Sequence, residues 1–68
     1  MPLPTIGSTL SNGSTLLAIR TKENGDTYVL CIYGKEFATW FFMDNGSTVS
    51  GHYHGINLPQ ALESLATR

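Results

Sequence analysis

Four stretches of this chain are dense in β-branched and aromatic residues, and residues typical of turns separate them. Asn-Gly pairs, the strongest short signal for a hairpin, stand at residues 24–25 and 45–46. Between them, Gly34-Lys35 suits a two-residue turn with glycine at its first position. The pattern predicts four consecutive strands, over Ser14–Thr21, Thr27–Tyr33, Phe37–Met43 and Ser47–His54.

The end of the chain changes to a helical period. In INLPQALESLATR, leucine and alanine recur at a spacing that gathers them on one face of a helix. Asn57 and Gln60 make a capping-box pattern, and Pro59 would stand in the first turn, where its missing N–H costs nothing. The pattern predicts a helix over Leu58–Thr67.

These elements predict a single α+β domain over residues 1–68. Residues 1–13 would form an N-terminal arm or a small edge hairpin that turns at Asn12-Gly13. Residues 14–54 would form a four-stranded antiparallel β-meander, and residues 57–68 would hold the C-terminal α-helix, packed on one face of the sheet.

Two-residue loops at all three turns would set the pairing of the strands. Trp40 would then pair with both Val29 and Gly51, and Cys31 with Ala38. Since side chains alternate along a strand, each residue falls on one of two faces. The first face would carry Leu16, Ala18, Val29, Cys31, Ala38, Trp40, Phe42, Val49, Gly51 and Tyr53.

The first face combines small residues with large ones. Ala18, Cys31 and Ala38 would form a row that makes a shallow groove, and we expect the leucines of the helix to fill it. Gly51 leaves room for the indole of Trp40 to lie over a position without a side chain. These features favour a structural role for Gly51 and Cys31 over a functional one.

The second face would carry apolar residues that one short helix on the first face cannot cover. A sheet with a solvated face should alternate apolar and polar residues, and such a patch exceeds what a soluble monomer exposes. Either the N-terminal residues fold across it or another chain does. We expect self-association, as a homodimer or higher assembly, and a further protein partner, through Leu17, Ile19, Tyr28, Leu30, Ile32, Phe37, Phe41 and Met43.

The composition argues against other classes of partner. Charged residues make up 13% of the chain and the net charge is −1, so no basic surface for nucleic acid is expected. No targeting signal or membrane-spanning stretch is visible. One cysteine, Cys31, excludes an internal disulfide, fits the cytoplasm and leaves no structural zinc motif. We expect no cofactor.

The segment SGHYHG holds the candidate chemistry of the chain. Ser50, His52 and His54 would share the second face of an edge strand, where two imidazoles two residues apart can chelate a metal ion. Two ligands are too few for a zinc site unless a dimer doubles them. A nucleophilic serine needs a base within hydrogen-bond reach, and residues 50 and 52 would lie about 7 Å apart. Polar residues that protect the edge strand and border the apolar face are the favoured interpretation.

The segments FATW and GHYH, followed by a short leucine- and alanine-rich helix that ends in arginine, resemble a group of small uncharacterised proteins of bacteria and their phages. In these, a Thr-Trp strand precedes a Gly-His-Tyr strand and an acidic helix. The chain differs from them in having one acid, Glu63, in its helix and a second histidine, His54. The resemblance implies the strand order and a phage or bacterial source, and says nothing about chemistry.

We therefore expect a non-enzymatic binding or regulatory protein of the cytoplasm, which a phage would direct at a host protein. The alternative is a metal-binding or metal-dependent enzymatic site at Ser50, His52 and His54, completed across a dimer.

Overall fold

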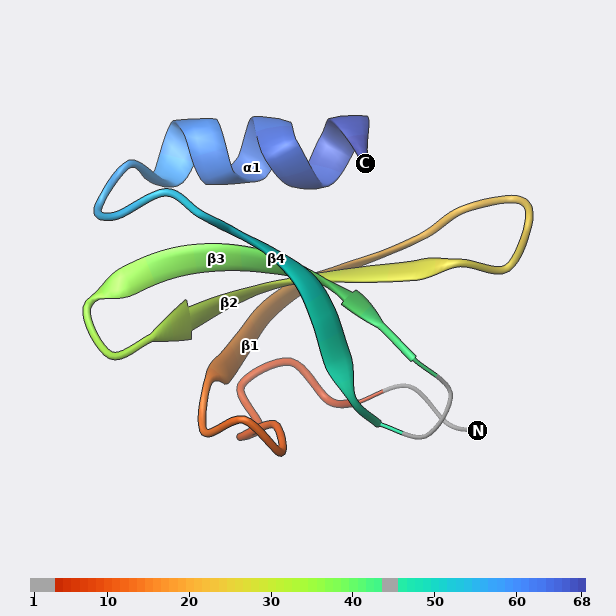
Figure 1. The fold of residues 1–68 in the computed structure, drawn as a ribbon, viewed down its shortest axis with the longest axis horizontal. Coiled ribbons are helices and arrows are strands. Elements are labelled where there is room, and N and C mark those ends of the chain that lie inside the picture. The colour runs from red at the N-terminus through yellow and green to blue at the C-terminus, as the bar shows by residue number, and fades with distance from the viewer. Residues whose placement is uncertain (1–3, 44–45) are drawn as a thin grey trace.

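The computed structural model describes residues 4–43 and 46–68 and has the predicted α+β architecture (Figure 1). Its strands form one open antiparallel sheet in the order β1-β2-β3-β4, and one C-terminal helix packs against it. The elements are β1 (Thr15–Thr21), β2 (Thr27–Tyr33), β3 (Glu36–Phe42), β4 (Thr48–Tyr53) and α1 (Leu58–Thr67).

The hairpin between β1 and β2 has a longer turn than predicted. The N–H of Gly25 donates to the Lys22 carbonyl at 3.0 Å, and the N–H of Lys22 donates to the Asp26 carbonyl at 2.8 Å. Gly25 has a φ of 94°, which favours glycine. The first paired residues beyond the turn are Thr21 and Thr27, so the two-residue loop predicted here is wrong.

The same pair of hydrogen bonds recurs at the other two Asn-Gly positions. Gly13 donates to Leu10 at 2.9 Å, and Gly46 donates to Met43 at 2.9 Å. Asn45 itself lies outside the described residues. At Gly34, by contrast, Tyr33 pairs directly with Glu36, which confirms the predicted two-residue turn.

The longer turn changes which face the residues of β1 occupy. Ala18 pairs with Leu30 and Ile19 with Val29, so Ala18 moves to the second face and Ile19 to the first. A register shift between Leu16 and Ala18 then returns Leu16 to the first face, opposite Cys31.

A second register shift lies between β3 and β4. Ala38 pairs with Tyr53 as predicted, but Phe41 pairs with Val49, which places Val49 on the second face and not the first. Ser50 lies at this irregularity with a φ of 56°, rare for a residue other than glycine.

Helix α1 packs on the second face, and not on the first as predicted. Ala61 and Leu65 are buried against Leu30, which is 1% exposed, and Ala18 and Tyr28 pack around them. The chain reaches this side through Gly55, whose carbonyl accepts from the N–H of Phe37 at 2.7 Å. With Ala18 on this face, a small residue lies where the helix approaches the sheet.

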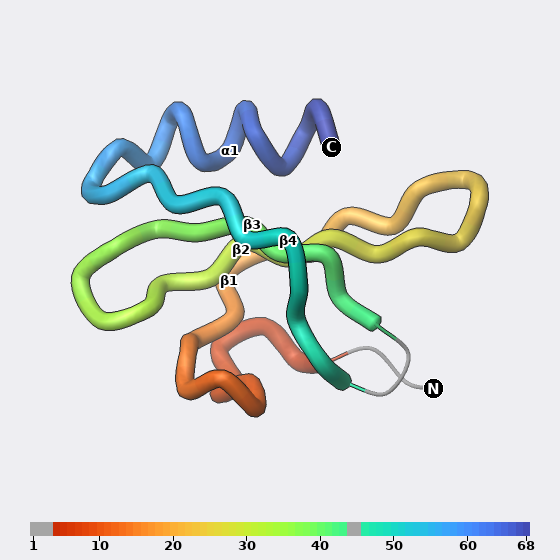
Figure 2. The backbone as a smooth tube through the Cα atoms, viewed as in Figure 1, coloured from red at the N-terminus to blue at the C-terminus, as the bar shows by residue number. Residues whose placement is uncertain are grey.

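The N-terminal arm covers the first face (Figure 2). Leu10 is buried in one cluster with Leu16, Val29, Cys31, Ala38 and Trp40. Ser8 accepts from the N–H of Leu16 at 2.9 Å, which fixes the arm to the edge of β1. Each face therefore has a covering segment from the same chain. Of the two alternatives left open, the arm covers a face, but this is the first face and not the second.

Candidate functional site

The three polar residues of the SGHYHG segment have different surroundings. The carbonyl of Ser50 accepts from Arg68 Nη2 at 2.6 Å. His52 is exposed and pairs with Thr39, whereas His54 is half-buried and its Nε2 has no hydrogen-bond partner. The irregular backbone at Ser50 interrupts the regular alternation that would have aligned all three side chains.

His54 borders a shallow hollow of about 260 Å³ beside the helix. The other lining residues are Gln60, Glu63, Ser64 and Thr67, all from α1. Among the residues that the structure describes, no group of three or more His, Cys, Asp or Glu could hold a metal ion. The described part of a single chain thus offers no complete ligand set around His52 and His54.

Arg68 organises the irregular part of the sheet, a role that sequence reasoning missed. Its Nη1 donates to the carbonyl and hydroxyl of Thr39 at 2.9 and 3.0 Å, and its Nη2 reaches Ser50 on the neighbouring strand. The guanidinium carbon lies 5.0 Å from the ring centroid of Tyr28. The hydroxyl of Ser64 lies 3.2 Å from that of Thr39. The guanidinium therefore joins the helix end to both strands across the register shift.

The residues predicted as an interface do not form one surface in the structure. Leu30 is buried under the helix, Ile19 packs with the cluster on the first face, and Tyr28 and Phe37 pack around the helix. Phe41 lies 5.3 Å from Tyr28, ring centroid to ring centroid. Of the predicted interface residues, Leu17 and Met43 are exposed, and Ile32 is half-buried.

One flank of the helix adds exposed leucines on the same face of the sheet. Ser64 contacts Thr39 of β3, and successive helical residues are about 100° apart, so Leu62 lies on the opposite flank, toward β2 and β1. Leu58 lies on that flank as well. Leu58 and Leu62 are 38% and 47% exposed. We group the two exposed leucines of this flank with Leu17 of β1 and Ile32 of β2 and call the four residues the apolar strip: Leu17, Ile32, Leu58 and Leu62.

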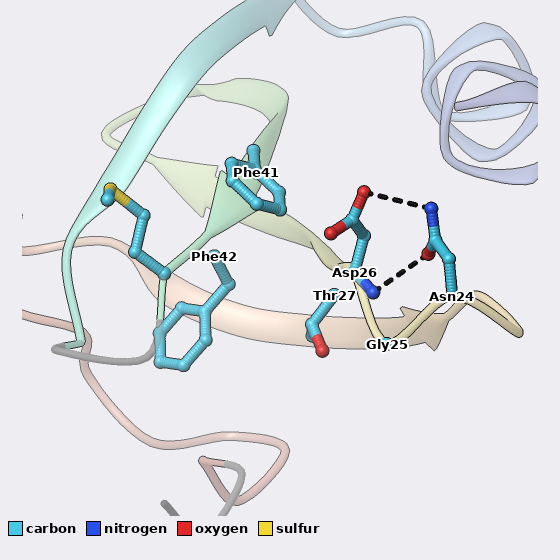
Figure 3. Close-up of a pocket in the computed structure, with 7 residues that line it drawn as sticks. Asn24, Gly25, Asp26, Thr27, Phe41 and Phe42 are labelled. Atoms are coloured by element: carbon cyan, nitrogen blue, oxygen red, sulfur yellow. Dashed lines mark hydrogen bonds between the residues drawn. The ribbon is translucent and has the colours of Figure 1, made fainter.

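A groove lies at the other end of the sheet, where the two hairpins diverge (Figure 3). It has a volume of about 500 Å³. One wall is the turn between β1 and β2, and the opposite wall is the end of β3. The lining residues are Asn24, Gly25, Asp26, Thr27, Phe41, Phe42 and Met43.

Cys31 has no feature of a reactive thiol. It is fully buried between Leu16 and Ala38. Burial raises the pKa of its thiol, and a hydrogen bond with the Ser14 side chain acts in the opposite direction. A buried thiol with a raised pKa is a poor nucleophile, so Cys31 serves the core.

Comparison with family models, with curated proteins and with solved structures finds no match to this chain. The resemblance of the FATW and GHYH segments to small bacterial and phage proteins stays a prediction. Within residues 4–43 and 46–68, no helix is long and apolar enough to cross a membrane.

Proposed function

We propose that this chain is a small non-enzymatic binding protein that associates with itself, and with a further protein, through the apolar strip. The observation that carries the proposal is the exposure of three leucines, Leu58 at 38% and Leu62 at 47% on one flank of α1, and Leu17 at 37% on β1. Burying a large aliphatic side chain contributes about 1.5–3 kcal/mol.

The strip is smaller than the face expected from the sequence, and this sets the strength of the association. Leu30 and Phe37 already pack against the helix and contribute little more on pairing. Association also costs at least about 4 kcal/mol in lost translational and rotational freedom. We therefore propose a two-fold dimer that dissociates reversibly at micromolar concentrations, in which a further partner competes for the same surface.

The proposed location and the proposed partner of the protein are supported by features of the sequence. A lone thiol, buried and reduced, fits the cytoplasm. The resemblance to small phage and bacterial proteins supports a host protein as the further partner. A binding role also agrees with the separate surroundings of Ser50, His52 and His54, since a nucleophilic site requires its base to contact the nucleophile.

Sedimentation equilibrium over a range of concentrations tests the dimer. The chain mass is 7.4 kDa, and the wild type should rise toward twice that value as concentration increases. Leu62→Glu should hold the mass at that of one chain. Gln60→Glu is the matched control, because it adds the same charge on the other flank of α1, and it should associate like the wild type.

Two results would overturn the proposal. A wild type that stays at the mass of one chain up to millimolar concentration would remove the self-association. Equal dimerisation of wild type and Leu62→Glu would place the contact elsewhere on the molecule. Circular dichroism of the variants confirms that each one is folded.

A further inference from the structure

The groove between the two hairpins combines an apolar wall with a carboxylate. Phe41 and Met43 supply the apolar side, and Met43 is 38% exposed. Phe42 points to the other side of β3, where it packs against the cluster on the first face. Figure 3 shows the phenyl ring of Phe41 and the carboxylate of Asp26 rising on the same side of the groove. A volume of about 500 Å³ falls within the range of sites that take small groups.

The carboxylate of Asp26 keeps one oxygen available. Its Oδ2 accepts from Asn24 Nδ2 at 3.2 Å, and its backbone N–H donates to Asn24 Oδ1 at 3.0 Å. Among the described residues it forms no ion pair. A guanidinium binds best to both oxygens of a carboxylate, whereas an ammonium needs one. The half-occupied carboxylate therefore suits an ammonium group.

The aromatic surface beside the groove already attracts cations. Lys22 Nζ lies 5.1 Å from the ring centroid of Tyr28, and the guanidinium carbon of Arg68 lies 5.0 Å from it. Phe41 is the next ring, 5.3 Å from Tyr28. A ring face attracts a cation within about 6 Å of its centroid. Phe41, whose ring lies on the same side of the groove as the Asp26 carboxylate, is thus a ring that a further cation can use.

We propose that this groove binds a lysine side chain of a partner protein. The methylene groups of the lysine would lie against Phe41 and Met43, and its ammonium would reach the free oxygen of Asp26. Lys22 is the internal competitor, since its side chain lies on the same hairpin, and Arg68 adds a second positive charge near Tyr28. The groove lies at the Thr27 end of β2 and the apolar strip at the Ile32 end, so neither proposal depends on the other.

Nuclear magnetic resonance titration with hexylammonium at low salt tests the site, because this probe has an apolar chain and one ammonium. Hexanol and hexanoate are matched probes with a neutral and a negative end. Backbone signals of Asn24, Asp26, Phe41 and Met43 should shift, and hexylammonium should bind about fivefold more tightly than hexanol. Hexanoate should bind more weakly than both.

Matched variants test whether Asp26 is responsible for the preference for hexylammonium over hexanol. Asp26→Asn keeps an oxygen for Asn24 and should abolish the advantage of hexylammonium over hexanol. Glu23→Gln removes a charge from the same turn outside the groove and should leave that advantage in place. Lys22→Met removes the competitor and should strengthen the binding of hexylammonium.

Several outcomes would overturn the proposal. Equal affinities for hexylammonium and hexanol in the wild type would show a merely apolar groove. Shifts confined to Leu58 and Leu62 would show that the probe binds the apolar strip instead. If the groove signals shift when the protein alone is diluted, and Lys35→Gln abolishes that shift, the occupant is a lysine of a second copy and not of a different protein.

Discussion

At the residue scale, Gly51 shows how one position constrains its neighbour. The prediction that the indole of Trp40 lies over Gly51 is confirmed, although the arm and not the helix covers that face. A Cβ atom at Gly51 would lie 2.5 Å from Trp40 Nε1 and 2.9 Å from Trp40 Cδ1. Trp40 is 5% exposed, held edge-on by Tyr33 and Tyr53 at centroid distances of 6.2 and 5.8 Å. The indole therefore has little freedom to move away.

Gly51→Val should accordingly destabilise the fold. The added side chain must displace a packed ring, and overpacking of this kind costs about 1–3 kcal/mol. Urea unfolding followed by tryptophan fluorescence measures the change. In a Trp40→Leu background, unfolding is followed by circular dichroism and the same substitution should cost clearly less. An equal cost in both backgrounds would mean that the penalty does not come from the indole.

The glycine contact could be predicted because the neighbouring pairs, Ala38 with Tyr53 and Thr39 with His52, keep the predicted register, although Trp40 itself lies where the register shifts. Ser50 could not be treated in that way. Its φ of 56° and its carbonyl bond to Arg68 arise from a contact between residues 18 positions apart. Local sequence carries no signal for such a contact, since serine has no preference for this backbone region.

At the element scale, the length of the turns decides the faces of the strands. The sequence predicted all four strands and the helix, because alternation and turn residues are local signals. It did not distinguish a two-residue Asn-Gly turn from the longer turn at Gly25. The one extra residue in the turn moved Ala18 from the first face to the second and Ile19 from the second face to the first. The helix then packed on the face that had been expected to be covered by the arm or by another chain.

The docking of helix α1 depends on Arg68 as well as on Ala61 and Leu65. Arg68→Met keeps the length of the side chain but removes three hydrogen bonds to Thr39 and Ser50. Hydrogen bonds of charged groups contribute about 1.5–3 kcal/mol, and a partly exposed group lies at the low end of that range. We expect a loss of about 1–2 kcal/mol in unfolding free energy, measured by urea unfolding.

Arg68→Lys should recover little of that loss, because one ammonium cannot reach the carbonyls of both strands in the planar geometry of a guanidinium. Lys35→Met is the control, since it removes an exposed cation from the turn between β2 and β3 that forms none of these hydrogen bonds, and it should change stability by less than about 0.5 kcal/mol. Full recovery by lysine would mean that the positive charge near Tyr28, and not the hydrogen-bond geometry, stabilises this region.

At the scale of the whole molecule, a 68-residue chain covers two faces of one sheet with two short segments. Figure 1 shows α1 on one side of the sheet and the arm on the other. A chain of this size buries only about 60% of its unfolded surface, so each covering segment carries a large share of the stability.

The sequence left open whether the arm or another chain would cover a face, because residues 4–14 show neither a helical nor a strand period. A charge at Leu30 is expected to unfold the chain, since Leu30 lies beneath the helix.

The arm supplies the last prediction. Leu10 is 8% exposed and lies over Leu16, Val29 and Trp40, so Leu10→Ala should leave a cavity and cost about 2–5 kcal/mol. Ile6→Ala is the matched control in the same arm, because Ile6 is 62% exposed and its loss should cost less than about 0.5 kcal/mol. Thermal unfolding by circular dichroism measures both. Since a small domain has only about 5 kcal/mol of stability, the Leu10 variant should be partly unfolded at room temperature. Equal stability of the two variants would mean that the arm does not hold the first face closed in solution, and that face would then become a second surface for association.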